Sequence, residues 1–369
     1  MKSKKLLMAL VLALSLTACQ QDEVKKDQEV VKENQELAEV NQDLEKYSGV
    51  FYDYFDTVTE FIFYAKDEEE FEKYQEILEE NLSRYHKLYN TYDDFEGVNN
   101  AKTINENAGK EAVEVDPEII ELLEYSEYIY DISDGKINYA LGNLIGLWHD
   151  YREEGLENPK ETAIPSEKEL KEAASYSDPS KIEINKEKNT VYIKDPNIQL
   201  DIGAVGKGYG IQKIAEKLED AGLSQGILSV GGDDVVIGKN PAREDGLWNI
   251  AIVNPNKDSE DQYASVIGLE DTTVVTSGDY QRFYEVDGEI YHHIIDSDTN
   301  YPSKYFRSVS VVHPDTALSD ALSTYLFTID LEAGKKVAEE FDADVMWIDY
   351  DNNIYKTEGY EELEKKSEN

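Results

Sequence analysis

The stretch Gln199-Leu-Asp-Ile-Gly-Ala-Val-Gly-Lys-Gly-Tyr-Gly210 organises the whole chain. Residues 190–194 before it alternate between apolar and polar side chains, as a half-buried strand does. Residues 211–223 after it carry apolar side chains at the spacing of one helix face, and residues 227–230 form an apolar run typical of a buried strand. This order predicts a strand–helix–strand unit whose glycines lie just before the helix.

Glycines have a chemical use at such a place. The first turn of a helix offers unpaired backbone N–H groups, and glycines let a phosphate approach them closely. Lys207 adds a positive charge. A P-loop requires Ser or Thr after the lysine, where this chain has Gly208, and the dinucleotide pattern Gly-x-Gly-x-x-Gly is absent from the stretch. The stretch therefore predicts either a phosphate site of another type or a tight turn without a ligand.

The composition limits the classes of partner. The chain has 369 residues and a formal net charge of −43. Its sequence has no basic stripe, which argues against nucleic acid as a partner. In so acidic a protein, an anionic ligand needs a local cation or a metal ion.

The first 18 residues have the form of a secretory signal. Lysines at positions 2, 4 and 5 precede a short apolar run that ends in Leu16-Thr17-Ala18-Cys19, which resembles the lipobox of bacterial lipoproteins. That resemblance implies cleavage before Cys19, a lipid on its thiol, and an extracytoplasmic location on the cell membrane. The alternative is an ordinary secretory signal with a chance cysteine. Cys19 is the only cysteine, so the chain has no second thiol for an internal disulfide.

Three segments are expected after the signal: a polar tether at 19–49, a folded domain at 50–356 and an acidic tail at 357–369. Periodicity predicts helices over residues 67–89, 117–132 and 316–329. Another helix is expected from Ser166, where Glu169 completes a capping box. Residues 235–253 are expected to form paired strands, and Asp287-Gly288 predicts a hairpin turn.

Two histidines follow a hydroxyl-rich motif. Residues 276–280 read Thr-Ser-Gly-Asp-Tyr, and His292 and His293 lie shortly after them. A neutral imidazole can act as a general base near pH 7. The alternative is a pair of strand histidines on opposite faces, one exposed and one in the core. A third histidine, His149 in the pair His149-Asp150, is interpreted as a surface helix end.

Oxygen side chains recur along a late helical segment. Asp320, Ser323 and Thr324 share one face if the segment is helical. Their oxygens suit a hard cation such as Mg²⁺, which takes a carboxylate together with phosphate oxygens of a substrate. The alternative is a first helical turn that uses Ser and Asp as caps.

Together these segments resemble the ApbE family of bacterial flavin-attaching lipoproteins. The resemblance covers roughly residues 50–349. Five ordered motifs carry it: Ser133-Asp-Gly with Leu144 to Trp148, Asp201 to Gly208 with Val230-Gly-Gly-Asp233, Thr276 to Tyr280, His293-Ile-Ile-Asp296, and Asp320 to Thr324. It implies an α+β fold with mixed β-sheets flanked by helices, in a two-lobed, T-fold-like domain with the flavin site in a cleft.

The resemblance also implies an activity. Such proteins are Mg²⁺-dependent FAD:protein FMN transferases, which take FAD as substrate, attach FMN through a phosphoester to a Thr or Ser hydroxyl of an exported protein with a flavinylation motif, and release AMP. Two other functions stay open for this chain. One is an FAD pyrophosphatase that uses water as the acceptor, and the other is a non-catalytic FAD-binding lipoprotein.

Matching positions carry the family's roles onto this sequence. The implied FAD-binding residues are Phe55, Tyr92, Lys136, Ile137, Asn138, Asp201, Lys207 and Ile294. The implied Mg²⁺ ligands are Asp320, Ser323, Thr324 and the backbone carbonyl of Ala204, and His293 is the implied base for the acceptor hydroxyl. Three segments depart from the family: Phe55-Asp56-Thr57 replaces Met-Gly-Thr, Asn138 replaces Asp, and Asp296-Ser-Asp-Thr-Asn300 replaces Asp-Pro-x-Thr-Gly.

Overall fold

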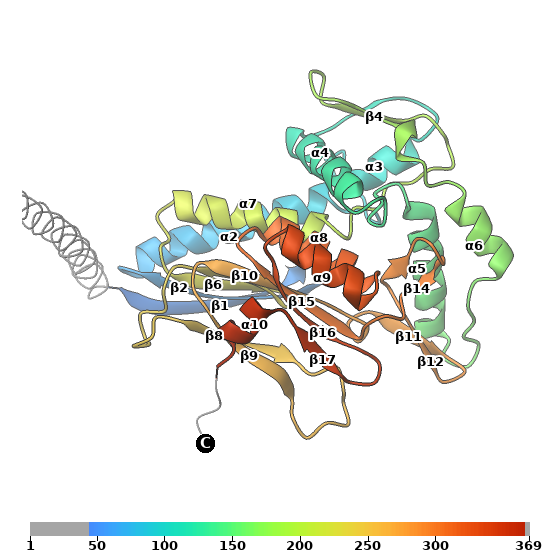
Figure 1. Cartoon of the computed structure of the whole chain (residues 1–369). Helices are drawn as coiled ribbons and strands as arrows, with labels where there is room; N and C mark the ends of the chain where they lie inside the picture. The colour runs from blue at the N-terminus through green and yellow to red at the C-terminus, as the bar shows by residue number, and fades with distance from the viewer. Residues whose placement is uncertain (1–43, 366–369) are drawn as a thin grey trace, which may run out of the picture.

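The computed structural model describes residues 44–365, which form two lobes (Figure 1). The larger lobe contains an eight-stranded sheet in the order β1-β2-β6-β7-β10-β15-β16-β17, and all neighbouring strands in it are antiparallel. The smaller lobe contains helices α3 to α6 and the three-stranded sheet β3-β5-β4. This arrangement confirms the predicted α+β fold with helices flanking several sheets.

The elements have the following bounds. The strands are β1 (Glu45–Tyr54), β2 (Thr57–Ala65), β3 (Val113–Glu114), β4 (Ile182–Asn185), β5 (Thr190–Ile193), β6 (Gly226–Val230), β7 (Asp233–Ile237), β8 (Trp248–Val253), β9 (Tyr263–Leu269), β10 (Thr272–Gly278), β11 (Phe283–Val286), β12 (Glu289–His292), β13 (Ile295–Asp296), β14 (Tyr301–Pro302), β15 (Ser308–His313), β16 (Asp344–Ile348) and β17 (Ile354–Lys356). The helices are α2 (Glu68–Leu88), α3 (Ala101–Glu106), α4 (Pro117–Ile132), α5 (Gly142–Glu157), α6 (Glu167–Ala174), α7 (Gly206–Asp220), α8 (Thr316–Phe327), α9 (Leu331–Glu340) and α10 (Glu358–Leu363).

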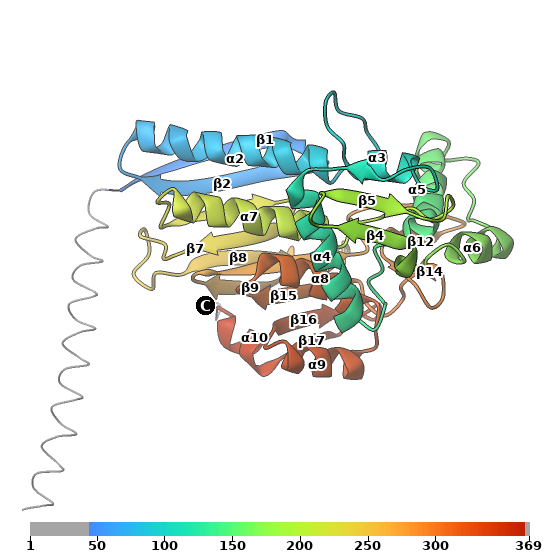
Figure 2. The same ribbon diagram turned by 90° about the horizontal axis from the view of Figure 1, so that it is seen from above.

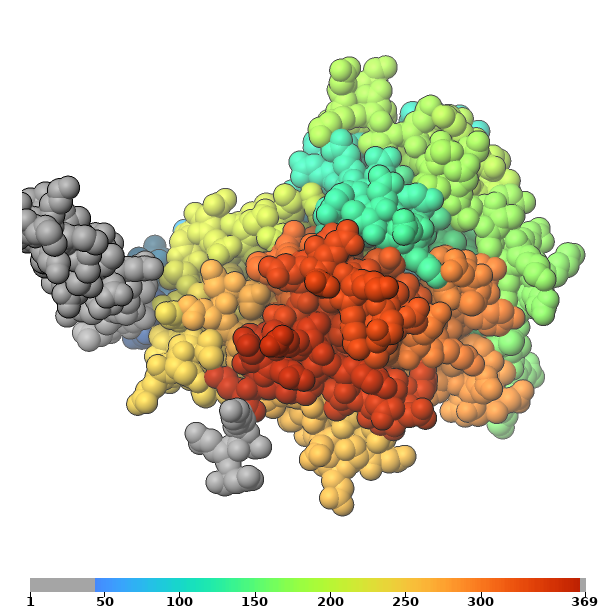
Figure 3. Space-filling model, viewed as in Figure 1, coloured from blue at the N-terminus to red at the C-terminus, as the bar shows by residue number. Residues whose placement is uncertain are grey.

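Both faces of the large sheet are covered. Helices α2, α7, α8 and α9 lie on one face, side by side in the view from above (Figure 2). The β8–β9 hairpin and α10 cover the other face, where alternate residues of β8 are buried against the sheet. In the space-filling view, the surface of α4 meets the surfaces of α8 and α9 directly (Figure 3). The two lobes therefore pack into one body.

Local sequence signals explain several helix starts. The Asp67 carboxylate accepts a hydrogen bond from the N–H of Glu70 at the start of α2. Asp116 caps α4, and Pro117 occupies its first position, where no hydrogen-bonded N–H is needed. The predicted capping box of Ser166 and Glu169 is present at the start of α6. The predicted hairpin turn is also confirmed, since Val286 pairs with Glu289 across it.

The predicted strand–helix–strand unit is wrong in its pairing. β5 belongs to the three-stranded sheet of the smaller lobe, whereas β6 belongs to the large sheet. The glycine stretch therefore crosses from one lobe to the other, and α7 begins at Gly206 rather than at Ile211. Glycine fits inside this helix because α8 is close: a Cβ at Gly208 would overlap the Cβ of Asp320.

Other predicted pairings and segment boundaries also differ from the structure. The predicted paired strands of residues 235–253 are β7 and β8, but β7 pairs with β6 and β10 while β8 pairs with β9. Strand β1 starts at Glu45, inside the segment 19–49 that the sequence assigned to the tether. The expected tail contains α10, whose Tyr360 is fully buried. Apolar partners in the fold, which local composition does not reveal, extend both ends of the domain.

The predicted signal, the tether up to residue 43 and Cys19 lie outside the described residues, as do residues 366–369. Within residues 44–365, no helix combines the length and the apolar character that a membrane crossing requires.

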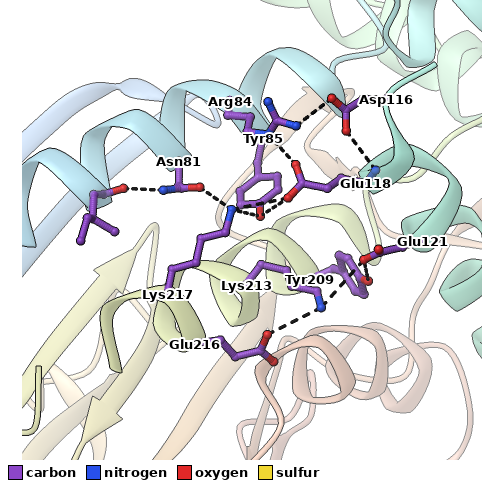
Figure 4. Close-up of polar contacts among 11 residues, drawn as sticks. Asn81, Arg84, Tyr85, Asp116, Glu118, Glu121, Tyr209, Lys213, Glu216 and Lys217 are labelled. Atoms are coloured by element: carbon purple, nitrogen blue, oxygen red, sulfur yellow. Dashed lines mark hydrogen bonds and ion pairs between the residues drawn. The ribbon is translucent and has the colours of Figure 1, made fainter. Parts of the chain in front are cut away.

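A polar network joins α7 to α2 and α4 behind the glycine stretch (Figure 4). Lys217 of α7 donates to Asn81 Oδ1 over 2.6 Å and to Tyr85 Oη over 2.9 Å. Its Nζ also lies 3.5 Å from Glu118 Oε1 of α4, and Arg84 of α2 pairs with Glu118 as well. The network fixes α7, the helix that begins in the glycine stretch, against α2 and α4.

Replacement of Lys217 by Met is expected to destabilise the fold by about 1–3 kcal/mol, because the buried side chains of Asn81 and Tyr85 would lose a charged donor. Lys213→Met is the matched control. The Nζ of Lys213 lies 3.6 Å from Glu216 and 4.0 Å from Glu121, and surface pairs of this kind contribute less than about 1 kcal/mol. Urea unfolding of both variants measures the difference, and equal losses would contradict the prediction.

Candidate functional site

A large cavity is formed by residues of both lobes. Its volume is about 1660 Å³, above the roughly 300–1,000 Å³ usual for small-ligand sites. Its walls include the β1–β2 turn, the loop after α2, α5, the glycine stretch, the β11–β12 hairpin and α8. Every residue that the sequence implied for FAD, the metal ion or catalysis lines this cavity, with the exception of Ser323. The fold thus brings together residues from Phe55 to Thr324.

Two carboxylates and one ammonium group meet at the start of α7. Lys207 Nζ lies 2.5 Å from Asp233 Oδ2, and the N–H of Gly208 donates to Asp320 Oδ2 over 2.7 Å. Burial, followed by the nearby Asp233, raises the pKa of Asp320 to about 7. Burial alone would lower the pKa of Lys207, but attraction to Asp233 and Asp320 outweighs it and raises this pKa. One lysine therefore faces two buried acids, and a further cation would balance their charge.

Ser323 is the one implied metal ligand that does not line the cavity. It is fully buried, and its Oγ donates to the carbonyl oxygen of Asp320 over 2.9 Å. The same Oγ lies 2.8 Å from Ser277 Oγ on β10. Helical spacing placed Ser323 on the face of Asp320, but the hydroxyl is used in the contact between α8 and the sheet. We therefore leave Ser323 out of the candidate metal site.

The remaining donors fit a hard divalent cation. Residues 44–365 contain no group of three or more His, Cys, Asp or Glu side chains arranged to hold a metal ion. Mg²⁺ does not require one, since it usually takes one or two carboxylates and completes its shell with water and substrate oxygens. Asp320, Thr324 and the carbonyl of Ala204 are all oxygen donors on the cavity wall. Together with the unbalanced charge, this donor set suits Mg²⁺ better than Zn²⁺, which prefers His and Cys.

The two adjacent histidines have different surroundings. His292 is 3% exposed; its Nδ1 accepts from the N–H of Ile294 over 3.2 Å, and its Nε2 donates to the carbonyl of Ser303 over 2.8 Å. His293 is half-buried, and its Nδ1 lies 3.3 Å from the carbonyl oxygen of Arg282. A carbonyl can only accept, so Nδ1 of His293 carries the proton and Nε2 keeps a lone pair. Burial, and then His292, lowers the pKa of His293 to about 3, which keeps the ring neutral at pH 7.

His292 is expected to make the fold sensitive to acid. Burial lowers its pKa to about 4, whereas an unfolded histidine titrates near 6.5. As the pH falls below about 6.5, the unfolded state takes up a proton that the native state refuses, so stability is lost. Between pH 7 and 5 this loss amounts to about 2 kcal/mol. Urea unfolding at both pH values should show a smaller pH dependence for His292→Gln, and an unchanged dependence would contradict the assignment.

Lys136 lines the cavity with its charge already paired. Its Nζ lies 2.9 Å from Asp296 Oδ1 and 2.7 Å from Asp298 Oδ2, and Asp296 is 4% exposed. These ion pairs tie the loop after α4 to β13. Asn138 is held similarly, since its Nδ2 donates to the carbonyl of Ser177 over 2.9 Å. The loop 136–138 is therefore fixed by its own polar contacts beside the cavity.

Phe55 reaches the cavity in an unusual conformation. Phe55 and Asp56 are the central residues of the β1–β2 turn, and both have φ of 54°. Hairpin turns of this kind favour Asn and Gly, so a Phe here costs on the order of 1 kcal/mol. Its N–H donates to His86 Nδ1 over 3.1 Å, and its carbonyl accepts from Arg282 Nη2 over 3.4 Å. Neighbours in the cavity wall thus hold the residue that replaces the family's Met.

Asp201 and Ile294 reach the cavity from distant segments of the chain. Asp201 Oδ1 accepts from the N–H of Gly203 over 3.0 Å, which stabilises the turn before α7, and burial raises the pKa of this carboxyl. Ile294 is buried, and its carbonyl accepts from the N–H of Ser303 over 3.0 Å. The implied roles of both residues toward FAD stay predictions.

The side chains of the cavity wall that sequence reasoning missed include His149, Arg152 and Arg282. The interpretation of His149 as a surface helix end is wrong, since its ring lines the cavity. The sequence held a signal that both side chains share one surface, because His149 and Arg152 lie three residues apart on one helix face directly after Trp148. The basic side chains of the wall are Lys136, Arg152, Lys160, Lys207 and Arg282. Three of them, Lys136, Arg152 and Lys207, are already paired with carboxylates, so an anionic ligand would have to share their charge or bring a metal ion.

Curated proteins with similar sequences share one description. An "FAD:protein FMN transferase" of Treponema pallidum is 31% identical over 269 residues, which cover 69% of this chain and 72% of that protein. One of Haemophilus influenzae is 28% identical over 257 residues, which cover 69% of this chain and 73% of that protein.

Solved structures agree with the fold. The ApbE protein of Thermotoga maritima superposes with a TM-score of 0.73 at 25% identity, covering 87% of this chain and 100% of that one. The flavin transferase ApbE of Vibrio cholerae superposes with a TM-score of 0.71 at 22% identity, covering 87% of this chain and 99% of that one. At this identity the likeness supports the fold and nothing more. The model of the ApbE family matches residues 55–347. Because this match spans most of the chain and joins both lobes around the cavity, the chain belongs to the ApbE family.

Proposed function

We propose that this protein is an FAD:protein FMN transferase. The acceptor hydroxyl oxygen forms a bond to the FMN phosphorus, the bond from that phosphorus to the bridging oxygen breaks, and AMP leaves with the bridging oxygen. The product is a phosphoester between FMN and a Ser or Thr of an exported protein. The curated relatives carry this activity in their names. The observation that carries the proposal is a single cavity lined by Lys207, Asp320, Thr324 and His293.

The glycine stretch and α8 are assigned to the pyrophosphate. Lys207 and the N-terminal turn of α7 bring positive charge toward the phosphates. Asp320, Thr324 and the carbonyl of Ala204 would hold Mg²⁺, which neutralises phosphate charge as it develops. The excess of buried carboxylate over ammonium at this point supports a cation there.

His293 is assigned as the general base. Its Nε2 lone pair is available, because Nδ1–H is directed to the carbonyl of Arg282. The proton of the acceptor hydroxyl passes to this Nε2 as the new bond forms. A pKa of about 3 makes a weak base, but negative phosphates beside the ring would raise the pKa because they favour imidazolium.

One experiment separates this function from its rivals. The full-length protein in detergent is incubated with FAD, Mg²⁺ and candidate exported acceptor proteins, and mass spectrometry follows each acceptor. A covalent gain of FMN on a Ser or Thr, with release of AMP, is the expected result. AMP release without an acceptor would indicate a pyrophosphatase instead. FAD that stays intact under all conditions would indicate a binding protein and would overturn the proposal.

We propose further that the protein acts outside the cytoplasm, anchored to the cell membrane by a lipid on Cys19. The support is the sequence Leu16-Thr17-Ala18-Cys19 after a basic and apolar leader. Labelled fatty acid should enter the wild-type protein in cells, and Cys19→Ala should abolish this labelling. A variant that keeps both the label and its place in the membrane fraction would disprove the anchor.

A further inference from the structure

Two aromatic rings lie against each other on the cavity wall. Tyr92 belongs to the loop between α2 and α3, and His149 lies on α5. Their ring centroids are 4.5 Å apart and their planes are inclined by 27°, which is a stacked geometry. Both residues line the cavity. Tyr92 nevertheless keeps 50% of its surface exposed. One ring face is therefore covered by His149, and the remaining surface is open to a ligand.

Hydrogen bonds fix the backbone around Tyr92, and the stack on His149 contributes to holding its ring. Asn90 Oδ1 accepts from the N–H of Tyr92 over 2.7 Å and from the N–H of Asp93 over 2.6 Å. These bonds shape the loop without restraining the side-chain torsions of Tyr92. A half-exposed tyrosine in a loop has more than one staggered rotamer available. The stack on His149 restrains the plane of the ring, and a hydrogen bond with the side chain of Thr91 is a second restraint.

His149 is itself held from behind. Arg152, one turn further along α5, has its Nη2 2.9 Å from His149 Nδ1. A guanidinium can only donate, so Nδ1 accepts and the imidazole is the neutral Nε2–H form. Arg152 also pairs with Glu153, and its side chain is 14% exposed. Burial, and then the charge of Arg152, lowers the pKa of His149, which favours the same neutral form.

We propose that His149 is a positioning residue: it holds the ring of Tyr92 so that the free face of that ring can stack on a planar heteroaromatic ring of the bound substrate. The inference rests on the proposed function in one respect, that the substrate is FAD. Aromatic rings presented on a cavity wall bind flat ligands through offset stacking, and a fixed ring loses less conformational entropy on binding than a mobile one. His149 acts through Tyr92 and has no part in the transfer chemistry.

Two substitutions separate the stack from the hydrogen bond. His149→Phe keeps an aromatic ring against Tyr92 but cannot accept from Arg152. His149→Gln keeps an acceptor for Arg152 but removes the ring. Tyr92→Ala removes the platform itself, and Asp150→Asn, an exposed neighbour on α5, serves as the neutral control. Quenching of flavin fluorescence measures FAD affinity in the full-length protein without any transfer step, and thermal unfolding checks that each variant is folded.

The expected order of affinity follows from the stack. His149→Gln and Tyr92→Ala should each weaken FAD binding about fivefold, and the double variant should lose little more than either alone. His149→Phe should restore affinity to within about twofold of wild type, with the same flavin absorption band. The inference is overturned if His149→Gln binds FAD with wild-type affinity. It is also overturned if His149→Phe binds FAD more weakly than His149→Gln does. If the wild-type protein does not bind FAD, the proposed function fails and the inference fails with it.

Discussion

Replacement of Asp320 by Asn should reduce FMN transfer by at least about 100-fold, the scale seen when a preorganised charge is removed from an active site. Asp320 is 6% exposed and lines the cavity, and its carboxylate accepts from the N–H of Gly208. An amide could still accept this bond, but it would not carry the negative charge that a cation requires. The measurement is single-turnover labelling of an acceptor protein over a series of Mg²⁺ concentrations.

The loss should not arise from unfolding. Burial and Asp233 raise the pKa of Asp320, which means that its charge is unfavourable in this environment in the absence of a cation. Asn at 320 removes that charge, so the variant should unfold no more easily than wild type. Asp220→Asn, at the exposed end of α7, is the matched control and should leave transfer unchanged. Full labelling by Asp320→Asn would remove Asp320 from the metal site.

Gly208→Ala should abolish most transfer and should destabilise the fold by about 1–3 kcal/mol, as overpacking does. A Cβ at this position would overlap the Cβ of Asp320 and lie 2.8 Å from the carbonyl oxygen of Thr316. Helices α7 and α8 would have to separate, and the separation would move Asp320 away from Lys207. Acceptor labelling and urea unfolding measure the two effects.

Gly210→Ala is the matched control in the same helix. Its Cβ would lie 3.4 Å from the Cβ of Tyr85 and 3.5 Å from Phe55, which are ordinary contacts. Alanine is favoured over glycine inside helices by about 0.5–1 kcal/mol, so this variant should be as stable as wild type or more so. The packing argument is wrong if Gly208→Ala behaves like Gly210→Ala.

Much of the local structure was predictable because it depends on neighbours in sequence. The helix caps at Asp116 and Ser166 and the turn at Asp287-Gly288 rely on bonds within a few residues. The pairing of strands was not predictable from such signals. β5 and β6 flank α7 in sequence, yet they lie in different sheets, since each buries its apolar face against residues far away in the chain.

Some residues of the candidate site were likewise predictable from the sequence, and others were not. Family motifs located Asp201, Lys207, His293, Asp320 and Thr324, and the fold gathers them at one cavity. The motif at 320–324 also suggested Ser323, whose hydroxyl is instead used inside the protein. His149 was set aside, because a histidine beside an aspartate indicates no role until the fold brings Tyr92, from a distant part of the sequence, against its ring.

The sequence by itself determined the family, the periodic helices, and the glycines and oxygen side chains available for phosphate and cation. These features are written in residue type and spacing, and no contact between distant residues is needed to recognise them. Only the tertiary structure decided which oxygens face the cavity, that one ammonium serves two buried acids, and which ring lies against Tyr92. Burial and orientation result from packing between segments more than 50 residues apart, such as Tyr92 and His149 or Lys207 and Asp320.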